Sequence, residues 1–196
     1  MAQAFRRHGD RIVGHLDEDE RELLAGLLTQ VARLIRGMGP AIPDLTGDPL
    51  ADAVAGLSAD PPRPQVDPAV RRLFPDARRD DGLQVAAEAE EFRRLTEMGL
   101  RQRKVATLEA AVSLLEHATD PEVLTLTTQQ AGQLTVALTD VRLVLGERLG
   151  LRTDADAAAL EELVEQLGED HPHVQTAALY DFLTWIQETL AEALVR

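Results

Sequence analysis

Residues 127–150 read TTQQAGQLTVALTDVRLVLGERLG, and this stretch decides the fold class. Thr127 followed three residues later by Gln130 matches a capping box, which predicts that a helix begins here, and Gly150 predicts where it ends. At about 100° per residue, apolar side chains fall on two opposite sides of this helix, which predicts a central position in a mainly helical protein. The first side carries Leu134, Leu138, Val141, Leu145 and Leu149, and the second carries Val136, Ala137, Leu143 and Val144.

Two charged residues interrupt these apolar sides. Asp140 falls within the second side and Arg142 at the edge of the first, so both are expected in the interior, where an unpaired charge is costly. Each therefore needs a partner from a neighbouring helix. Such a group is either a polar site or a buried network that fixes helix packing, and the second interpretation is favoured because structural ion pairs are placed in the same way. The predicted network consists of Arg94, Lys104, Asp140, Arg142 and Tyr180.

Capped amphipathic segments predict helices over most of the remaining chain. Asp17 and Glu20 match a second capping box, which opens a helix that continues to Gly37. Asp67 followed by Pro68 is typical of a helix start. The further predicted helices are a short one that reaches Phe74, Leu83–Leu95 and Glu97–His117 with Thr96 as the boundary between them, Ala157–Leu167, and a last one from Val174 to the C-terminus.

Short extended runs around turn residues predict a small β element. Ala4–Leu16 contains two such runs on either side of His8-Gly9-Asp10, where Gly and Asp favour a turn, so a hairpin is predicted. Val123–Leu126 contains a β-branched residue and is a candidate third strand beside the hairpin. The predicted fold class is therefore mainly α, a helical bundle with a small N-terminal β-hairpin.

The chain is expected to form a single domain, residues 1–196, in three parts. Residues 1–36 form the hairpin and the first helix, and residues 67–196 form the helical bundle. Between them, residues 37–66 hold six prolines and four glycines, which predict a mobile linker with at most a short helix at Pro49–Leu57. A linker of this length is either a functional lid or a surface loop with no role of its own.

The composition excludes several classes of chemistry. The 196 residues include no cysteine, which excludes disulfides, thiol nucleophiles and thiolate metal sites. Ser58 and Ser113 are the only serines and do not resemble members of a catalytic triad, while His171 and His173 lack a third ordered metal ligand. We therefore expect no enzyme activity, cofactor or metal. No apolar stretch of about 20 residues is present, so we expect a cytoplasmic protein without a membrane segment.

Charge and aromatic residues are unevenly spread. The net charge is −14, which opposes binding to nucleic-acid phosphates, so DNA binding by this chain alone is not expected. Residues 63–104 carry ten basic and eight acidic residues, whereas residues 105–196 carry four and sixteen. Aromatic residues near the C-terminus either cover the core or anchor a partner, and the basic residues belong either to a contact patch or to a solvated mixed surface. The candidates for partner contact are Phe182, Trp185, Arg93 and Arg101.

Four strings of this sequence resemble the actinobacterial AosR-like family of oxidative-stress transcriptional regulators, which was formerly a domain of unknown function. The similarity covers nearly the whole chain outside the linker, and the order and spacing of the strings are specific. The strings are FRRHGDRIVGHLDEDE at residues 5–20, EFRRLTEMGLRQRK at 91–104, LTDVRLVLGERLGL at 138–151 and LYDFLTWIQETLAEAL at 179–194.

The resemblance implies a cytoplasmic regulator that acts on transcription by contacting a sigma factor or RNA polymerase, with oxidative stress as the signal. Sensing in that family is thiol-based, and this chain has no cysteine. The resemblance therefore implies either that this member does not sense oxidants directly or that its partner carries the sensor. The alternative function is a helical scaffold or adaptor unrelated to transcription. The sequence leaves open whether the protein is a monomer or a homodimer.

Overall fold

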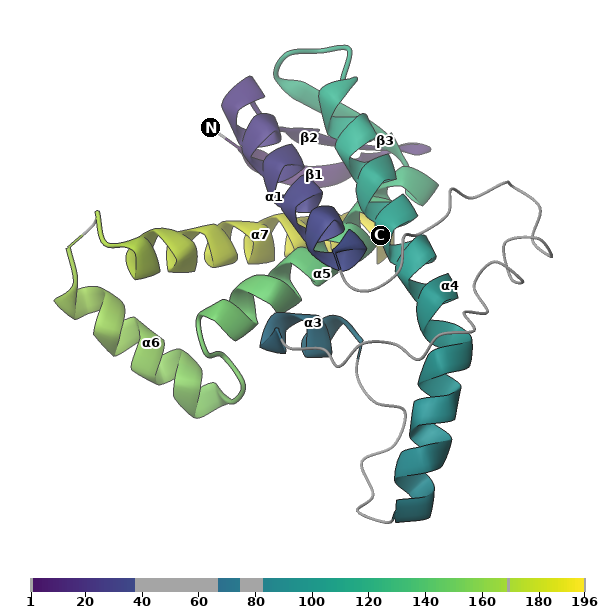
Figure 1. Cartoon of the computed structure of the whole chain (residues 1–196). Helices are drawn as coiled ribbons and strands as arrows, with labels where there is room; N and C mark the ends of the chain where they lie inside the picture. The colour runs from purple at the N-terminus through teal and green to yellow at the C-terminus, as the bar shows by residue number, and fades with distance from the viewer. Residues whose placement is uncertain (1, 38–66, 75–82, 169, 196) are drawn as a thin grey trace.

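The computed structural model combines a small antiparallel sheet with packed helices, as the sequence predicts (Figure 1). It describes residues 2–37, 67–74, 83–168 and 170–195, with 83–98 described as helical backbone. The predicted linker, apart from Gly37, lies outside the described residues, as does the short helix predicted within it. The sheet has the order β1-β2-β3 and consists of β1 (Gln3–His8), β2 (Arg11–His15) and β3 (Val123–Thr127).

The hairpin and the third strand follow the predicted pattern. Gly9 lies in the turn between β1 and β2 with φ = 65°, a backbone conformation that residues with a side chain rarely adopt. Gly14 on β2 allows a close approach, because a Cβ atom there would lie 2.5 Å from the ring of Phe5. β3 pairs antiparallel with β2, so residues about 110 positions apart complete the sheet.

Two predicted capping boxes are present in the structure. The carboxylate of Asp17 accepts from the backbone N–H of Glu20, and the hydroxyl of Thr127 accepts from that of Gln130. In each case the second side chain returns a hydrogen bond to the capping residue. The helices are α1 (Glu18–Arg36), α3 (Pro68–Leu73), α4 (Leu83–Glu116), α5 (Thr128–Arg148), α6 (Asp154–Gln166) and α7 (Pro172–Val195).

The predicted boundary at Thr96 is wrong, because α4 runs through it as one helix of 34 residues. Thr and Gly within a helix cost only about 0.5–1 kcal/mol each, which packing of the C-terminal half of α4 against α1 and α5 outweighs. The start of α6 is also earlier than predicted. Thr153 and Asp156 form a third capping box, and Thr153 lies four residues before the predicted start at Ala157. Likewise, α7 begins at Pro172, two residues before the predicted start.

The core lies between the sheet and α5, which contacts α3, α4, α7 and α1. Leu134 and Leu138 of α5 are fully buried, in agreement with its predicted central position. Val136 departs from the prediction because it is 55% exposed, so the second apolar side of α5 is only partly covered. Among the described residues, no helix is long and apolar enough to cross a membrane.

Arginine side chains from distant segments bind several of the carbonyl groups that helix ends leave unpaired. Arg7 of β1 donates to the carbonyl oxygens of Ala193 and Leu194 at the end of α7, at 3.1 and 3.3 Å. Arg101 of α4 donates to the carbonyl of Ile35 near the end of α1 at 3.2 Å. These contacts attach the helix ends to the rest of the fold.

Candidate functional site

The first part of the predicted network is an ion pair between α4 and α5. The ammonium Nζ of Lys104 lies 2.6 Å from Oδ1 of Asp140, and the two side chains are 20% and 4% exposed. Lys104 also lies 5.9 Å from the ring centroid of Phe74, which follows α3. The second carboxylate oxygen of Asp140 is buried and has no hydrogen-bond partner in the described structure. This ion pair therefore joins α4 to α5 beside the residue that follows α3, and one oxygen of its buried carboxylate has no partner in the described structure.

The second part is centred on Arg142 and joins α5 to α7. The guanidinium of Arg142 donates to Oε1 of Gln187 at 2.6 Å and to the hydroxyl of Tyr180 at 3.2 Å. The amide of Gln187 in turn donates to the carbonyl of Thr135 and to the hydroxyl of Thr139. Within the described chain, Arg142 is in contact with neutral groups and has no carboxylate partner. The predicted residues thus divide into two groups on nearly opposite sides of α5, because Asp140 and Arg142 are only two residues apart, about 200° around the helix.

Both groups have the features of structural connections. Each consists of direct side-chain contacts between packed helices. Of their members, only Tyr180 lines one of the cavities found among the described residues, a groove between α6 and α7. Such contacts fix how helices pack, because a shift of one turn would leave a buried charge without its partner. Arg94, the remaining member of the predicted network, lies in the stretch that is described by its backbone.

The residues predicted to contact a partner occupy different environments. Phe182 and Trp185 of α7 are partly buried, pack against the core and stack on each other with ring centroids 6.3 Å apart. Arg101 is only 2% exposed, so the structure places it in the interior and not on a contact surface. Arg93 lies within residues 83–98 of α4, which are described as helical backbone.

A groove between α6 and α7 was not predicted from the sequence. It has a volume of about 250 Å³ and is mostly apolar, with Glu161 and Asp181 among its lining residues. None of the 13 residues of α6 is buried, so this helix covers the groove only loosely. From residue 153 to 195 the sequence has ten acidic residues and no Lys or Arg. The apolar lining consists of Leu151, Ala157, Leu160, Val164, Val174, Ala177 and Ala178.

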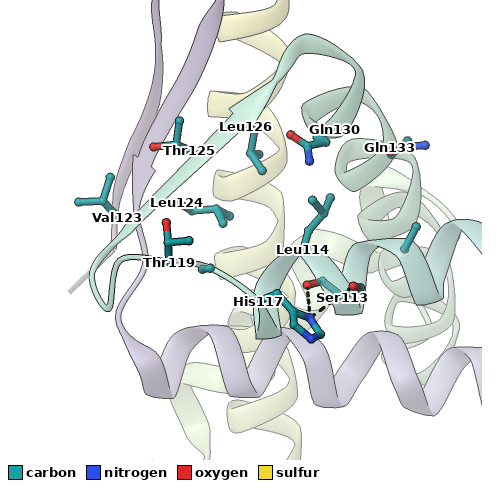
Figure 2. A pocket seen from close by; sticks show the side chains of 12 residues that line it. Ser113, Leu114, His117, Thr119, Val123, Leu124, Thr125, Leu126, Gln130 and Gln133 are labelled. Atoms are coloured by element: carbon teal, nitrogen blue, oxygen red, sulfur yellow. Dashed lines mark hydrogen bonds between the residues drawn. The ribbon is translucent and has the colours of Figure 1, made fainter.

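A second unpredicted feature is a cavity of about 460 Å³ beside β3 (Figure 2). Its lining comes from the end of α4, the following loop, β3 and the start of α5, so no single stretch of sequence contains its signal. Figure 2 shows His117 hydrogen-bonded to Ser113 at one end of this hollow. The lining residues are Ala110, Ser113, Leu114, His117, Ala118, Thr119, Val123, Leu124, Thr125, Leu126, Gln130 and Gln133.

Local hydrogen bonds lower the pKa of four carboxyl groups, those of Asp17, Asp120, Glu147 and Asp156. Hydrogen bonds from Arg72, at 2.9 Å, and Arg152, at 2.5 Å, lower the pKa of Glu147 and join the end of α5 to α3. The hydroxyl of Thr153, followed by nearby backbone N–H groups, lowers the pKa of Asp156 at the start of α6. These shifts arise from structural contacts.

The two candidate metal-binding histidines lie at the start of α7. Nδ1 of His171 accepts a hydrogen bond from the backbone N–H of His173 at 3.2 Å, so His171 has a role at the beginning of the helix. In the part of the chain that the structure covers, no group of three potential metal ligands is present.

The fold and its contacts define a mainly helical protein with a three-stranded sheet, an acidic α6–α7 region and a cavity beside β3 that has no Asp, Glu, Lys or Arg in its lining. The chain belongs to the family described as a domain of unknown function, DUF2017, whose model matches residues 2–194. The comparisons with curated proteins and with solved structures found no match.

Proposed function

We propose that this protein is a cytoplasmic regulator of transcription in the oxidative-stress response that acts through contact with a sigma factor or RNA polymerase. The resemblance of its sequence strings to the AosR-like regulators supports the biological setting. The observation that supports protein contact is the apolar groove between α6 and α7, set in an acidic region.

The groove has the chemistry of a contact site for a basic amphipathic segment. Leu160 and Val164 of α6 line the groove together with Val174 of α7, and burial of apolar side chains there would supply the main favourable term. Glu161 and Asp181 lie beside these residues and would attract Lys or Arg that flank the apolar anchors.

The stacked aromatic pair extends this surface along α7. Trp185 is four residues beyond Asp181, so the two side chains are neighbours on the helix surface. Phe182 and Trp185 are only partly buried, and aromatic residues of this kind are frequent anchors in protein interfaces. The groove and the aromatic pair together form what we call the α6–α7 surface.

A binding measurement with purified RNA polymerase, with and without its sigma factors, tests this proposal. Val164→Glu places a charge in the groove and is expected to weaken binding at least tenfold. Ala158→Glu is the matched control, because Ala158 is exposed on the same helix outside the groove lining. Equal loss in both variants, or no binding by the wild-type protein, would contradict the proposal. Specific binding to a complex unconnected with transcription would support the adaptor function instead.

A further inference from the structure

Within the described part of the chain, the outer edge of β3 has one unpaired position. The backbone N–H of Leu16 donates to the carbonyl of Glu122 at 3.0 Å, so these residues form a hydrogen-bonded pair of the antiparallel β2–β3 ladder. Such pairs alternate with pairs that are not hydrogen-bonded. Counting along the register, Thr125 opposite Val13 belongs to the second kind. The N–H and C=O groups of Thr125 therefore point away from β2, towards the free edge.

Side chains of the protein itself close both ends of this edge. The N–H of Val123 donates to Oδ1 of Asp120 at 2.9 Å, and the N–H of Thr127 donates to Oε1 of Gln130 at 2.9 Å. The N–H groups of Val123 and Thr127 point outward from the sheet, like the N–H group of Thr125. This direction agrees with the β2–β3 register. Edge strands are commonly protected against pairing in such ways. Here the protection leaves the middle residue open.

The cavity beside β3 has the size of one short additional strand. A slot one strand wide, three residues long and one sheet spacing deep, about 4.8 by 10 by 10 Å, has a volume of about 480 Å³. The cavity measures about 460 Å³. The cavity is lined by β3, by Ala110 and Leu114 of α4, and by Ala118 of the loop that follows α4. A fourth strand in this position would lie beside Thr125, with α4 among its neighbours.

The lining contains no Asp, Glu, Lys or Arg, although the chain as a whole carries a net charge of −14. Nδ1 of His117 lies 3.0 Å from the carbonyl oxygen of Ser113, which only accepts, so in the neutral ring Nδ1 carries the proton and Nε2 is an acceptor. Gln133 makes no hydrogen bond through its side chain in the described structure. Its amide and the Thr125 backbone thus offer neutral donors and acceptors.

We propose that β3 binds a short, extended, uncharged segment of a partner protein as a fourth strand. The Thr125 N–H and C=O groups form the two central backbone hydrogen bonds, and the closed ends limit the added strand to about three residues. This proposal rests on the proposed function, since it adds a second contact with the same partner, on a different face from the α6–α7 surface.

Titration of the isotope-labelled full-length protein with two peptide pools tests this proposal by nuclear magnetic resonance. The first pool contains blocked hexapeptides of Ala, Val, Thr, Ser and Gln, and the second has Lys or Glu at a central position. We expect the first pool to shift the Thr125 amide resonance and slow its hydrogen exchange at least tenfold. The second pool should bind at least tenfold more weakly. No effect on Thr125, or equal binding of the two pools, would overturn the proposal.

Three variants separate backbone pairing from other effects. Thr125→Pro removes the outward N–H and should abolish peptide binding, whereas Thr125→Val keeps it and should bind normally. Ala110→Phe fills the slot from α4 without altering β3 and should also abolish binding, which gives a second test should the proline variant fail to fold. Unchanged binding by Ala110→Phe would contradict the proposal. A dimer that dissociates in Thr125→Pro would also contradict it, by showing a second copy at this edge.

The peptide experiment is independent of the polymerase experiment. Peptide binding at Thr125 without any binding of polymerase would refute the proposed function and retain the strand site. Polymerase binding that depends on Val164, with no peptide bound at Thr125, would refute the strand site and retain the proposed function.

Discussion

Lys104 and Asp140 form an ion pair that differs at its two ends. The Lys104 side chain is 20% exposed, whereas that of Asp140 is 4% exposed and, among the described residues, one of its oxygens has no partner. Loss of the lysine would leave a fully enclosed carboxylate, but loss of the aspartate would leave an ammonium group that can still reach water. The two ends should therefore respond differently to substitution.

We predict that Lys104→Met destabilises the protein by about 5 kcal/mol and Asp140→Leu by about 3 kcal/mol, the range for removing one member of a buried pair. The double variant should be more stable than Lys104→Met alone, because no buried charge is left without its partner. Denaturant unfolding measures all three. Glu188→Ala, at an exposed position of α7, serves as the control and should change stability by less than about 0.5 kcal/mol. Additive effects of the two substitutions would show that the residues are not coupled.

Glu147 leads to a prediction about pH. Its hydrogen bonds with Arg72 and Arg152 lower its pKa below the ordinary value of 4.5, so the contact stabilises the folded state above that pH and is lost as the pH falls through the lowered pKa. At pH 7, Glu147→Gln should cost about 1 kcal/mol, since both arginines are partly exposed. The difference from wild type should shrink steadily below pH 4.5. A difference that stays constant down to pH 2 would exclude this mechanism.

Asp156 leads to a prediction about local stability. From the sequence, Asp156→Ala is expected to have little effect because it lies on a solvated helix, but the structure shows that its carboxylate caps the start of α6. Since α6 has no buried residue, we expect faster hydrogen exchange across α6 with little change in the global unfolding midpoint. Glu162→Ala, later on the same helix, should leave this exchange unchanged. Polymerase binding should weaken with Asp156→Ala if the α6–α7 surface is the contact.

Gly14 provides a steric test of the sheet. Gly14→Ala would place a Cβ atom 2.5 Å from the buried ring of Phe5 and should destabilise the protein by about 1–3 kcal/mol. Gly26→Ala is the matched control, because Gly26 lies within α1 and a Cβ atom added there would meet nothing within 4 Å. It should stabilise the protein by up to about 1 kcal/mol. Thermal unfolding should show midpoint temperatures that shift in opposite directions for the two variants. Equal shifts of the midpoint would contradict the packing of Phe5 on Gly14.

Local signals in the sequence were sufficient where the structure depends on local chemistry. The capping boxes at Asp17 and Thr127, the hairpin around Gly9 and the third strand all follow from residues within a few positions of one another. The continuity of α4 through Thr96 does not follow from local residues, because tertiary packing outweighs a weak boundary signal.

The sites depend on contacts that a single segment does not contain. The sequence indicates that Asp140 needs a partner but does not select Lys104 from the other basic residues. Arg101 is buried, and the carbonyl of Ile35, 66 residues away in the sequence, accepts a hydrogen bond from it. The cavity beside β3 and the α6–α7 groove are each assembled from separate elements, so their linings have no periodic signal.

The hydrogen bonds from Arg7 to Ala193 and Leu194 have a consequence for the order of folding. During synthesis, β1 and β2 leave the ribosome first, but β3 follows only after about another 110 residues, and the end of α7 last of all. An isolated two-stranded hairpin is at best marginally stable in water. The hairpin is thus synthesised before the other described elements but is among the last of them to be completed. Contacts at such large sequence separation slow folding, and the hairpin remains exposed until the C-terminal helix docks against it.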